Sequence, residues 1–278
     1  MVLGYVFLLS KGENVDIRFL GQCGFLLEED GMSIVIDPVL SDLKENGQTI
    51  MNYPPVMSPS DIAPDYCFCT HDHIDHLDID TVCGFADSND KTMFVIPEGC
   101  RKLLTGRGIS QDRIITFDDG ESKVLVQGGK FYDVKDSSKS INENSIEVTA
   151  YSTAHPVHHL DADGLDRNLL YSILWNGHRY VHLGDTYRTD RLVKSLKKLG
   201  HIDVLFSPIN GRDDEREARG IIGNLSARET ALLAIELKVS LVYPMHFDMV
   251  KGNTADPAEF VEEMERIGGK TEYIIPRM

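Results

Sequence analysis

The stretch Thr70-His71-Asp72-His73-Ile74-Asp75-His76 decides how this chain is interpreted. It follows an apolar run, Asp65–Cys69, which predicts a strand that ends where the polar residues begin. His71 and His73 are two positions apart, so in an extended segment their side chains leave on the same side. Three imidazoles and a carboxylate in so short a span are ligands that zinc favours and that manganese or iron also accept. A solvated loop explains this spacing poorly, so the motif predicts a metal site at a strand end.

A metal site needs further ligands, and these should come from the ends of other strands. Three candidates follow predicted strands at 146–151, 179–183 and 241–244, and they are His155, Asp185 and His246. Each alone more often caps a turn, but together with the first motif they supply enough ligands for two metal ions. Asp37 also ends a predicted strand, and we expect it to orient a ligand by hydrogen bonds.

The rest of the chain repeats one pattern in each half. Strand-like apolar runs come first and helical patterns come later, which favours two β-rich layers packed together with helices outside. The polar segment Lys135–Asn144 separates the halves, but it is too short to establish separate domains. We therefore expect a single domain over residues 1–278, made of two similar halves at about 1–135 and 145–278.

Helix signals are most specific in the second half. Ser226 and Glu229 have the spacing of a capping box, which predicts a helix from there to Leu237. Asp256 followed by Pro257 predicts another helix start. Further helices are expected at 98–105 and 190–199, and Gly128-Gly129 predicts a hairpin turn.

Composition excludes several classes of protein. The chain has 278 residues and a formal net charge of −16, so its general surface is a poor match for nucleic acid or an anionic membrane. Five cysteines, an odd number, favour free thiols in a reducing compartment, and we expect Cys67 and Cys69 to be buried as small apolar residues. The apolar start Met1–Ser10 has no basic residues before it and is shorter than the roughly 20 residues of a membrane span. We expect a cytoplasmic protein whose partner is a small molecule, with a homo-oligomer left open.

In chain order, the metal-ligand candidates resemble the five signature motifs of the metallo-β-lactamase superfamily, over nearly the whole chain. The resemblance implies an α/β fold, a four-layer αβ/βα sandwich of the metallo-β-lactamase type, with a dinuclear site at one edge of the two sheets. It implies that His71, His73 and His155 hold one ion, and that Asp75, His76 and His246 hold the other. It also implies that Asp185 bridges the two ions and that Asp37 orients the ligands by hydrogen bonds.

Within that superfamily, several segments are similar to the L-ascorbate-6-phosphate lactonase branch. They are Leu20-Gly21-Gln22-Cys23-Gly24-Phe25, the His71–His76 motif, Arg219-Gly220-Ile221, Ser226–Glu229 and Asp256-Pro257. The chain is shorter than that lactonase, and it has a third-motif histidine, His155, that the branch lacks. The likeness implies hydrolysis of a lactone or ester of a sugar-acid phosphate.

The expected chemistry is hydrolysis by a hydroxide that two divalent ions activate near neutral pH. Zinc or manganese is expected, with iron as a further option. Asp75 and Asp185 are the expected catalytic residues, because they hold the ions at the reacting centre and Asp75 can orient the nucleophile. Two divalent cations outweigh the charge of these two carboxylates, so the pocket accepts a small anion although the surface repels nucleic acid.

Two other functions stay open. A metal-dependent phosphodiesterase needs the same ions, but the acidic surface argues against a nucleic-acid substrate. A metal-binding sensor or scaffold with little catalysis is the second, and a complete ligand set argues against it.

Two weaker candidates concern substrate binding. The loop at 211–220 carries three arginines, and Arg219, or less so Arg212, is suited to bind an anionic substrate. His158 follows His155 closely enough to line a pocket. A solvated polar loop is the alternative for each.

Overall fold

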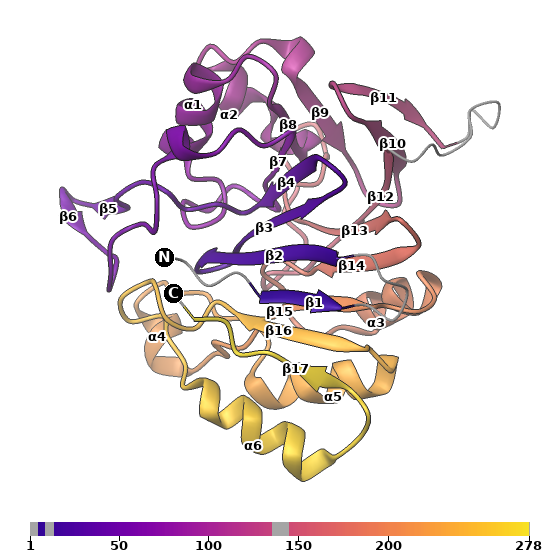
Figure 1. The fold of residues 1–278 in the computed structure, drawn as a ribbon. Helices are drawn as coiled ribbons and strands as arrows, with labels where there is room; N and C mark the ends of the chain where they lie inside the picture. Colours follow the sequence, from indigo (N-terminus) through magenta and orange to yellow (C-terminus); the bar gives the residue numbers. More distant parts are fainter. Residues whose placement is uncertain (1–4, 9–13, 135–144, 278) are drawn as a thin grey trace.

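The computed structural model describes residues 5–8, 14–134 and 145–277, and most of its strands form two large sheets (Figure 1). The first sheet has seven strands in the order β1 (Tyr5–Leu8), β2 (Asn14–Gly21), β3 (Gly24–Glu29), β4 (Met32–Ile36), β7 (Tyr66–Phe68), β8 (Met93–Pro97) and β9 (Ile114–Phe117). The second has eight strands in the order β11 (Lys130–Asp133), β10 (Ser122–Val126), β12 (Ser145–Ser152), β13 (Leu169–Trp175), β14 (His178–His182), β15 (Val204–Pro208), β16 (Leu241–Met245) and β17 (Glu272–Tyr273). A separate short hairpin consists of β5 (Lys44–Glu45) and β6 (Gln48–Thr49).

Both sheets change from antiparallel to parallel pairing part-way across. In the first sheet β1 to β4 pair antiparallel, and β4, β7, β8 and β9 pair parallel. In the second sheet β11, β10, β12, β13 and β14 pair antiparallel, and β14 to β17 pair parallel. Consequently β2, β4 and β7 run in one direction, and so do β12, β14 and β16 within their sheet. The residues that follow strands of one direction are gathered at one edge of each sheet.

The main apolar core lies between the two sheets, and both contribute to it. Phe25 of the first sheet meets Phe206 of the second with ring centroids 4.4 Å apart, and Phe206 stacks on Tyr243 at 5.5 Å. Aromatic pairs of this kind add about 0.5–1.5 kcal/mol each beyond the area that they bury. The packing of these rings holds the two sheets face to face.

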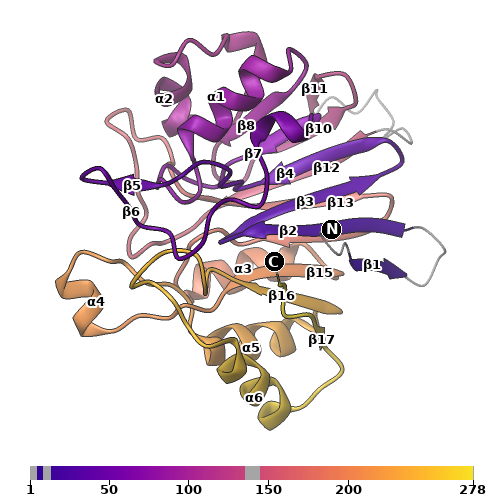
Figure 2. The same cartoon turned by 60° about the vertical axis from the view of Figure 1, so that its left-hand side comes forward.

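Helices cover the outer faces of both sheets. On the first, α1 (Ile79–Ser88) and α2 (Arg101–Thr105) pack through a second apolar cluster. On the other, α3 (Asp190–Lys198), α5 (Ala227–Leu237) and α6 (Pro257–Ile267) pack through a third. Figures 1 and 2 show α1 and α2 on one side of the paired sheets and α5 and α6 on the other. The expected four-layer α/β sandwich is confirmed.

Local signals explain several boundaries. The Ser226 side chain accepts from the backbone N–H of Glu229 and the capping box forms as expected, and Asp256 caps α6. The Gly128-Gly129 turn joins β10 to β11. The segment expected to be one helix at 98–105 divides into a 3₁₀ turn, Glu98–Cys100, and α2.

Two helices were not expected from the sequence. Helix α1 begins immediately after the metal motif, where Asp78 accepts from the backbone N–H groups of Asp80 and Thr81. Helix α4 (Asp214–Ala218) is one short turn within the arginine-rich loop, capped by Asp213. Polar residues dominate both starts, so helical periodicity is weak there and only the aspartate caps signal the helices.

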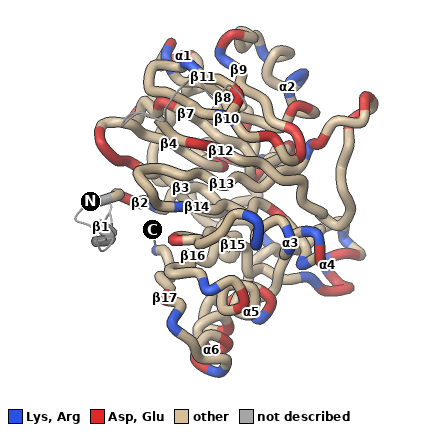
Figure 3. Tube along the Cα trace, turned by 90° about the vertical axis from the view of Figure 1, so that its right-hand side faces the viewer, with Lys and Arg blue, Asp and Glu red and all other residues tan. Residues whose placement is uncertain are grey.

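Charged residues lie mainly on helices and connecting loops, and the strands are mostly free of them (Figure 3). Among the described residues no helix is both long and apolar enough to cross a bilayer. The polar loop at 135–144 lies outside the described residues.

Candidate metal centre

The topology brings the ends of six strands to one place. These strands run in one direction within their sheets, and polar residues follow each of them. Gln22 and Cys23 follow β2, Asp37 follows β4, the His71–His76 motif follows β7, His155 follows β12, Asp185 follows β14 and His246 follows β16. Residues far apart in the sequence therefore meet at one edge of the sandwich.

Asp37 fixes the orientation of two histidines. Its Oδ1 accepts from the Thr70 backbone N–H at 2.7 Å, and its Oδ2 accepts from the Thr70 hydroxyl and from His76 Nδ1, each at 2.7 Å. Because the Thr70 hydroxyl gives its proton to Asp37, it accepts from His71 Nδ1 at 3.0 Å. Both imidazoles therefore carry their proton on Nδ1, which leaves the Nε2 lone pair free to bind a metal ion.

One cluster of ligand atoms comes from His71, His73, His155 and Asp185. Each residue offers one ligand atom, and these atoms lie within 4.8 Å of one another. The rings of His71 and His73 have centroids 4.6 Å apart, and those of His73 and His155 are 5.2 Å apart. Asp185 Oδ2 lies 3.4 Å from His155 Nε2. Three imidazoles and a carboxylate form a common donor set for zinc.

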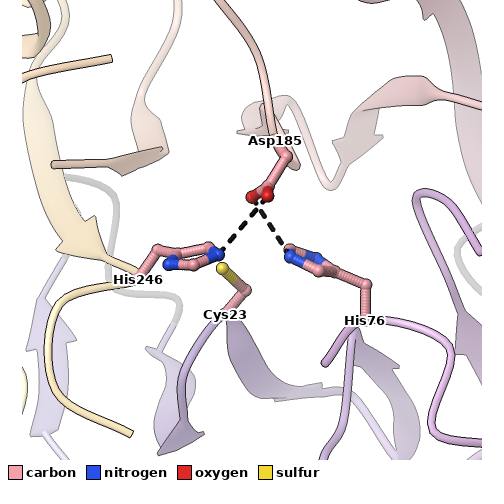
Figure 4. Close-up of side chains that lie close together, drawn as sticks. All are labelled: Cys23, His76, Asp185 and His246. Carbon is pink, nitrogen blue, oxygen red and sulfur yellow. Dashed lines mark ion pairs between the residues drawn. The ribbon is translucent and has the colours of Figure 1, made fainter. Parts of the chain in front are cut away.

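The second cluster shares Asp185 and adds Cys23, His76 and His246, again with ligand atoms within 4.8 Å of one another. Asp185 Oδ1 lies 3.1 Å from His76 Nε2, and Asp185 Oδ2 lies 3.4 Å from His246 Nε2. Figure 4 shows the carboxylate between the two imidazole rings, with the cysteine sulfur close by. Because both clusters contain Asp185, this carboxylate can bridge two ions.

Asp75 lies beside the second cluster. Its Oδ2 is 3.3 Å from His246 Nε2 and 3.9 Å from His76 Nε2. The fully buried Gln22 donates to the same oxygen at 2.8 Å and contacts the His246 ring at 3.1 Å. Gln22 therefore holds Asp75 and His246 together, a role that the sequence did not reveal.

The unpaired atoms of the site fit metal ions. Among the buried side-chain atoms of the described residues that form no hydrogen bond, four belong to the ligand clusters: Nε2 of His71 and of His76, Nδ1 of His155 and Oδ1 of Asp185. Leaving such a group unpaired costs about 1–3 kcal/mol. Imidazole nitrogens and carboxylate oxygens are ordinary metal ligands, so a cation bound at each cluster would supply the missing partner. The residues therefore fit two divalent ions.

The electrostatics of the first cluster also suit a cation. Burial lowers the pKa of His155 to about 4 and that of His71 well below its usual range, so both are neutral at pH 7, as a ligand must be. Burial acts to raise the pKa of Asp185, but the charges of His246 and His76 outweigh it and hold that pKa well below its usual range. A carboxylate that stays ionised among imidazoles is prepared to bind metal.

Backbone strain is concentrated at the site. Gln22, Asp37 and His246 have φ values of 52°, 45° and 60°, and they are three of the seven non-glycine residues with positive φ in the described segments. Gly184, at φ +57°, leaves no room for a side chain, since an added Cβ would lie 2.8 Å from Thr70. Strained residues of this kind persist where the surrounding structure holds them, typically at functional sites.

A pocket of about 470 Å³ opens over the ligands. Asp75, Asp185 and His246 form part of its wall. Its rim is formed by Glu45 and Ile50, by Ile74 of the metal motif, by Gly220–Ile222 and by Val250, Lys251 and Asn253. The ligand clusters are therefore open to a small molecule from one side.

The two residues expected to bind substrate lie at different places. Arg219 is exposed, and its guanidinium lies next to Gly252, in the segment that forms the pocket rim. His158 is turned to Ser152, with Nδ1 donating to the hydroxyl at 2.7 Å, and it is not among the described residues that line the pocket. Arg212 pairs with Glu229 at 2.8 Å. Substrate contact by Arg219 or His158 stays a prediction.

Curated relatives cover most of the chain. An uncharacterized protein of Mycobacterium tuberculosis is 27% identical over 208 residues, which are 72% of this chain and 50% of that protein. The chain thus spans about half the length of this relative. A UPF0173 protein of Pyrococcus furiosus is 25% identical over 90% of both chains. A protein of Salmonella heidelberg named as a probable L-ascorbate-6-phosphate lactonase is 24% identical over 79% of this chain and 59% of its own.

Solved structures share the fold. Igni18, a metallo hydrolase of Ignicoccus hospitalis, has a TM-score of 0.62 at 19% identity and 94% coverage of both chains. An isothiocyanate hydrolase from Delia radicum gut bacteria has a TM-score of 0.65 at 15% identity, covering 94% of this chain and 96% of its own. A family model described as a beta-lactamase superfamily domain matches residues 16–246, the range that holds every residue of both ligand clusters. The chain belongs to the metallo-β-lactamase superfamily.

Proposed function

We propose that the protein is a hydrolase that uses two divalent metal ions to open a lactone or ester bond in a small anionic metabolite. The observation that carries the proposal is the sharing of Asp185 by two ligand clusters beneath an open pocket of about 470 Å³. The similarity to the Salmonella lactonase supports the choice of a lactone or ester.

The residues divide the work between them. His71, His73 and His155 would hold one ion, His76 and His246 the other, and Asp185 both. Bound divalent ions supply two kinds of chemistry, a lowered pKa for water and polarisation of the oxygen that gains charge. The Asp75 carboxylate faces the pocket beside His246, where it can orient a nucleophile.

The rim of the pocket supports a small anion with an apolar part. Lys251 lines the pocket, and the Arg219 guanidinium lies next to the neighbouring residue Gly252, so two cations stand near the entrance. Ile50, Ile74 and the other aliphatic residues of the rim offer contact to a carbon skeleton. A substrate whose phosphate or carboxylate group lies near Lys251 would have its ester bond above the ligand clusters.

A phosphodiesterase is the second candidate. An N-acyl-phosphatidylethanolamine-hydrolyzing phospholipase D 1 of Caenorhabditis elegans is 28% identical over 207 residues, 69% of this chain and 52% of that protein. The aliphatic rim is compatible with an ester that carries an apolar chain. The two candidates share the metal centre and differ in the bond that is cleaved.

The test is a substrate panel with defined metals. Chelator-stripped protein is supplied with zinc or manganese and assayed on sugar-acid lactones, carboxyl esters and phosphodiesters, each in an anionic and a neutral form. We expect metal-dependent turnover, greatest on an anionic lactone or ester. Turnover of phosphodiesters alone would favour the second candidate. Two bound ions without turnover of any member would contradict the proposal and support a binding protein.

A pair of lysine variants tests substrate charge. Lys251→Ala removes the cation at the rim, and Lys194→Ala removes an exposed lysine on α3. We expect Lys251→Ala to raise KM for the anionic substrate about three- to tenfold, equivalent to about 0.7–1.4 kcal/mol, with kcat unchanged. An equal effect of both variants, or a KM effect on the neutral substrate, would contradict the role of Lys251.

A further inference from the structure

Cys23 occupies a position that its sequence context did not single out. It follows the turn at the end of β2, and β2 runs in the same direction as β4 and β7, so the turn reaches the edge that carries the metal ligands. The side chain is fully buried. Figure 4 shows its sulfur between the rings of His76 and His246, near the Asp185 carboxylate.

The distances place the sulfur within a ligand shell. Cys23 Sγ and one ligand atom each from His76, Asp185 and His246 lie within 4.8 Å of one another. In tetrahedral zinc sites bonds of about 2.0–2.3 Å put neighbouring ligand atoms about 3.3–3.8 Å apart. The limit of 4.8 Å between these four atoms is about 1 Å more than that spacing, so they surround a space of the size that one ion needs.

A second, independent observation points to a ligand at this centre. His76 Nε2 and Asp185 Oδ1 are buried and lie 3.1 Å apart, yet neither forms a hydrogen bond with any described residue. The two side chains are 0% and 3% exposed, so water does not supply the partner from bulk solvent. Both residues belong to the group that contains the sulfur.

The other cysteines have different surroundings. Cys67, Cys69 and Cys100 belong to the apolar cluster beneath α1 and α2, and Cys83 is half-buried on α1. Within the described residues, Cys23 is the one cysteine that lies in a group of potential ligands. It also borders the core between the sheets, so its sulfur lies where the core meets the site.

We propose that Cys23 binds the second metal ion as a thiolate, together with His76, His246 and Asp185, and that the sulfur makes this position prefer zinc to manganese. Binding forms a metal–sulfur bond and releases the thiol proton to solvent, so the oxidation state of the cysteine does not change. Thiolate is a soft donor that favours zinc, whereas manganese prefers oxygen donors. The proposal rests on the dinuclear centre described under the proposed function.

Cobalt is the probe that reports a metal–sulfur bond without any turnover. Chelator-stripped protein is loaded with two equivalents of Co²⁺, and the near-ultraviolet absorption is recorded for the wild type and for Cys23→Ala, Cys23→Ser and Cys67→Ala. Cys67 is the matched control, because it is equally buried and lies on a strand outside the site. We expect a thiolate-to-cobalt charge-transfer band in the wild type and in Cys67→Ala, and its loss in both Cys23 variants.

Affinities test the metal preference. Titration with Zn²⁺ and with Mn²⁺ should show that Cys23→Ser weakens the second zinc site about tenfold or more and manganese binding by less than about threefold. Zinc binding to the variant should also release one proton fewer per chain. Two bound cobalt ions without the band, or a band unchanged in Cys23→Ser, would overturn the proposal and leave the hydrolase intact. Failure to bind any metal would instead overturn the dinuclear centre. If a Cys23 variant does not fold, the wild-type spectrum alone still shows whether a thiolate binds the cobalt ion.

Discussion

His76 Nδ1 donates to Asp37 Oδ2 over 2.7 Å, and both side chains are completely buried. The same carboxylate holds Thr70, whose hydroxyl in turn accepts from His71. One aspartate that does not face the pocket therefore sets the protonation of two histidines and turns a free nitrogen of each toward the ligand clusters.

Asp37→Asn should weaken metal binding without removing a ligand. The amide has one acceptor oxygen, so it cannot accept all three hydrogen bonds that the carboxylate accepts from Thr70 and His76, and the imidazoles lose their fixed tautomer and orientation. We expect zinc affinity, measured by competition with a chromophoric chelator, to fall about 10–100-fold. Asp65→Asn is the control, because Asp65 accepts from the Ser33 backbone at the opposite end of β7. Affinities within twofold of wild type for Asp37→Asn would contradict this role.

Asp185→Asn should separate the two metal positions. Its carboxylate approaches His155, His76 and His246 within 3.4 Å and is common to both clusters. We expect turnover to fall about a thousandfold, since a metal ion supplies several kcal/mol of charge stabilisation, and bound zinc to fall below two per chain. Asp203→Asn, which loses a contact with the Arg179 backbone, should keep both ions. Two tightly bound ions in Asp185→Asn would refute the bridging role.

Gly184→Ala should damage the site through packing. A Cβ there would lie 2.8 Å from Thr70, the residue that links Asp37 to His71, at a φ of +57°. We expect the free energy of unfolding to fall by about 2–4 kcal/mol, from backbone strain and overpacking together. Gly177→Ala has a similar positive φ and open space around its Cβ, so it should cost only about 1 kcal/mol. Equal costs in urea unfolding would show that close approach to Thr70 is unimportant.

Asp166 should make stability fall as pH rises. Burial, together with the neighbouring Asp118 and Asp119, raises its pKa to about 6 against the hydrogen bond from Ser152. The folded chain therefore binds more protons than the unfolded chain, whose aspartates titrate near about 3.9, so this contribution is present below about pH 4 and is lost as pH rises through about 6.

Asp166→Asn removes that dependence, because the amide stays neutral. Between pH 4.5 and 7 the difference in unfolding free energy should move in favour of the variant by about 1 kcal/mol, allowing for solvent screening. Urea unfolding of both proteins at several pH values measures it. A difference in unfolding free energy that stays constant across this pH range would show that the pKa of Asp166 is not raised in the folded protein.

Much of the fold and site could be predicted because the signals are local. Apolar runs ended by polar residues marked the strands that carry the ligands, and the capping patterns at Ser226 and Asp256 marked α5 and α6. The structure brings the predicted ligands His71, His73, His155 and Asp185 into one group, although they come from segments up to 114 positions apart (from His71 to Asp185).

The contributions of Gln22 and Cys23 could not be predicted, because they depend on strand direction rather than on residue pattern. β2 belongs to the antiparallel part of its sheet, and only its pairing through β3 to β4 shows that it ends at the ligand edge. A single cysteine in an apolar strand context indicates burial. The signal that was present was the motif Gly21-Gln22-Cys23-Gly24, whose tight turn needs the left-handed backbone that Gln22 adopts.

The most direct test of the central claim is the rate of lactone or ester hydrolysis as zinc is titrated into chelator-stripped protein. Two ligand clusters that share Asp185 predict that the rate rises until two zinc ions are bound per chain and then stays level. A rate that is already maximal at one zinc per chain, or no hydrolysis at any ratio, would contradict the account.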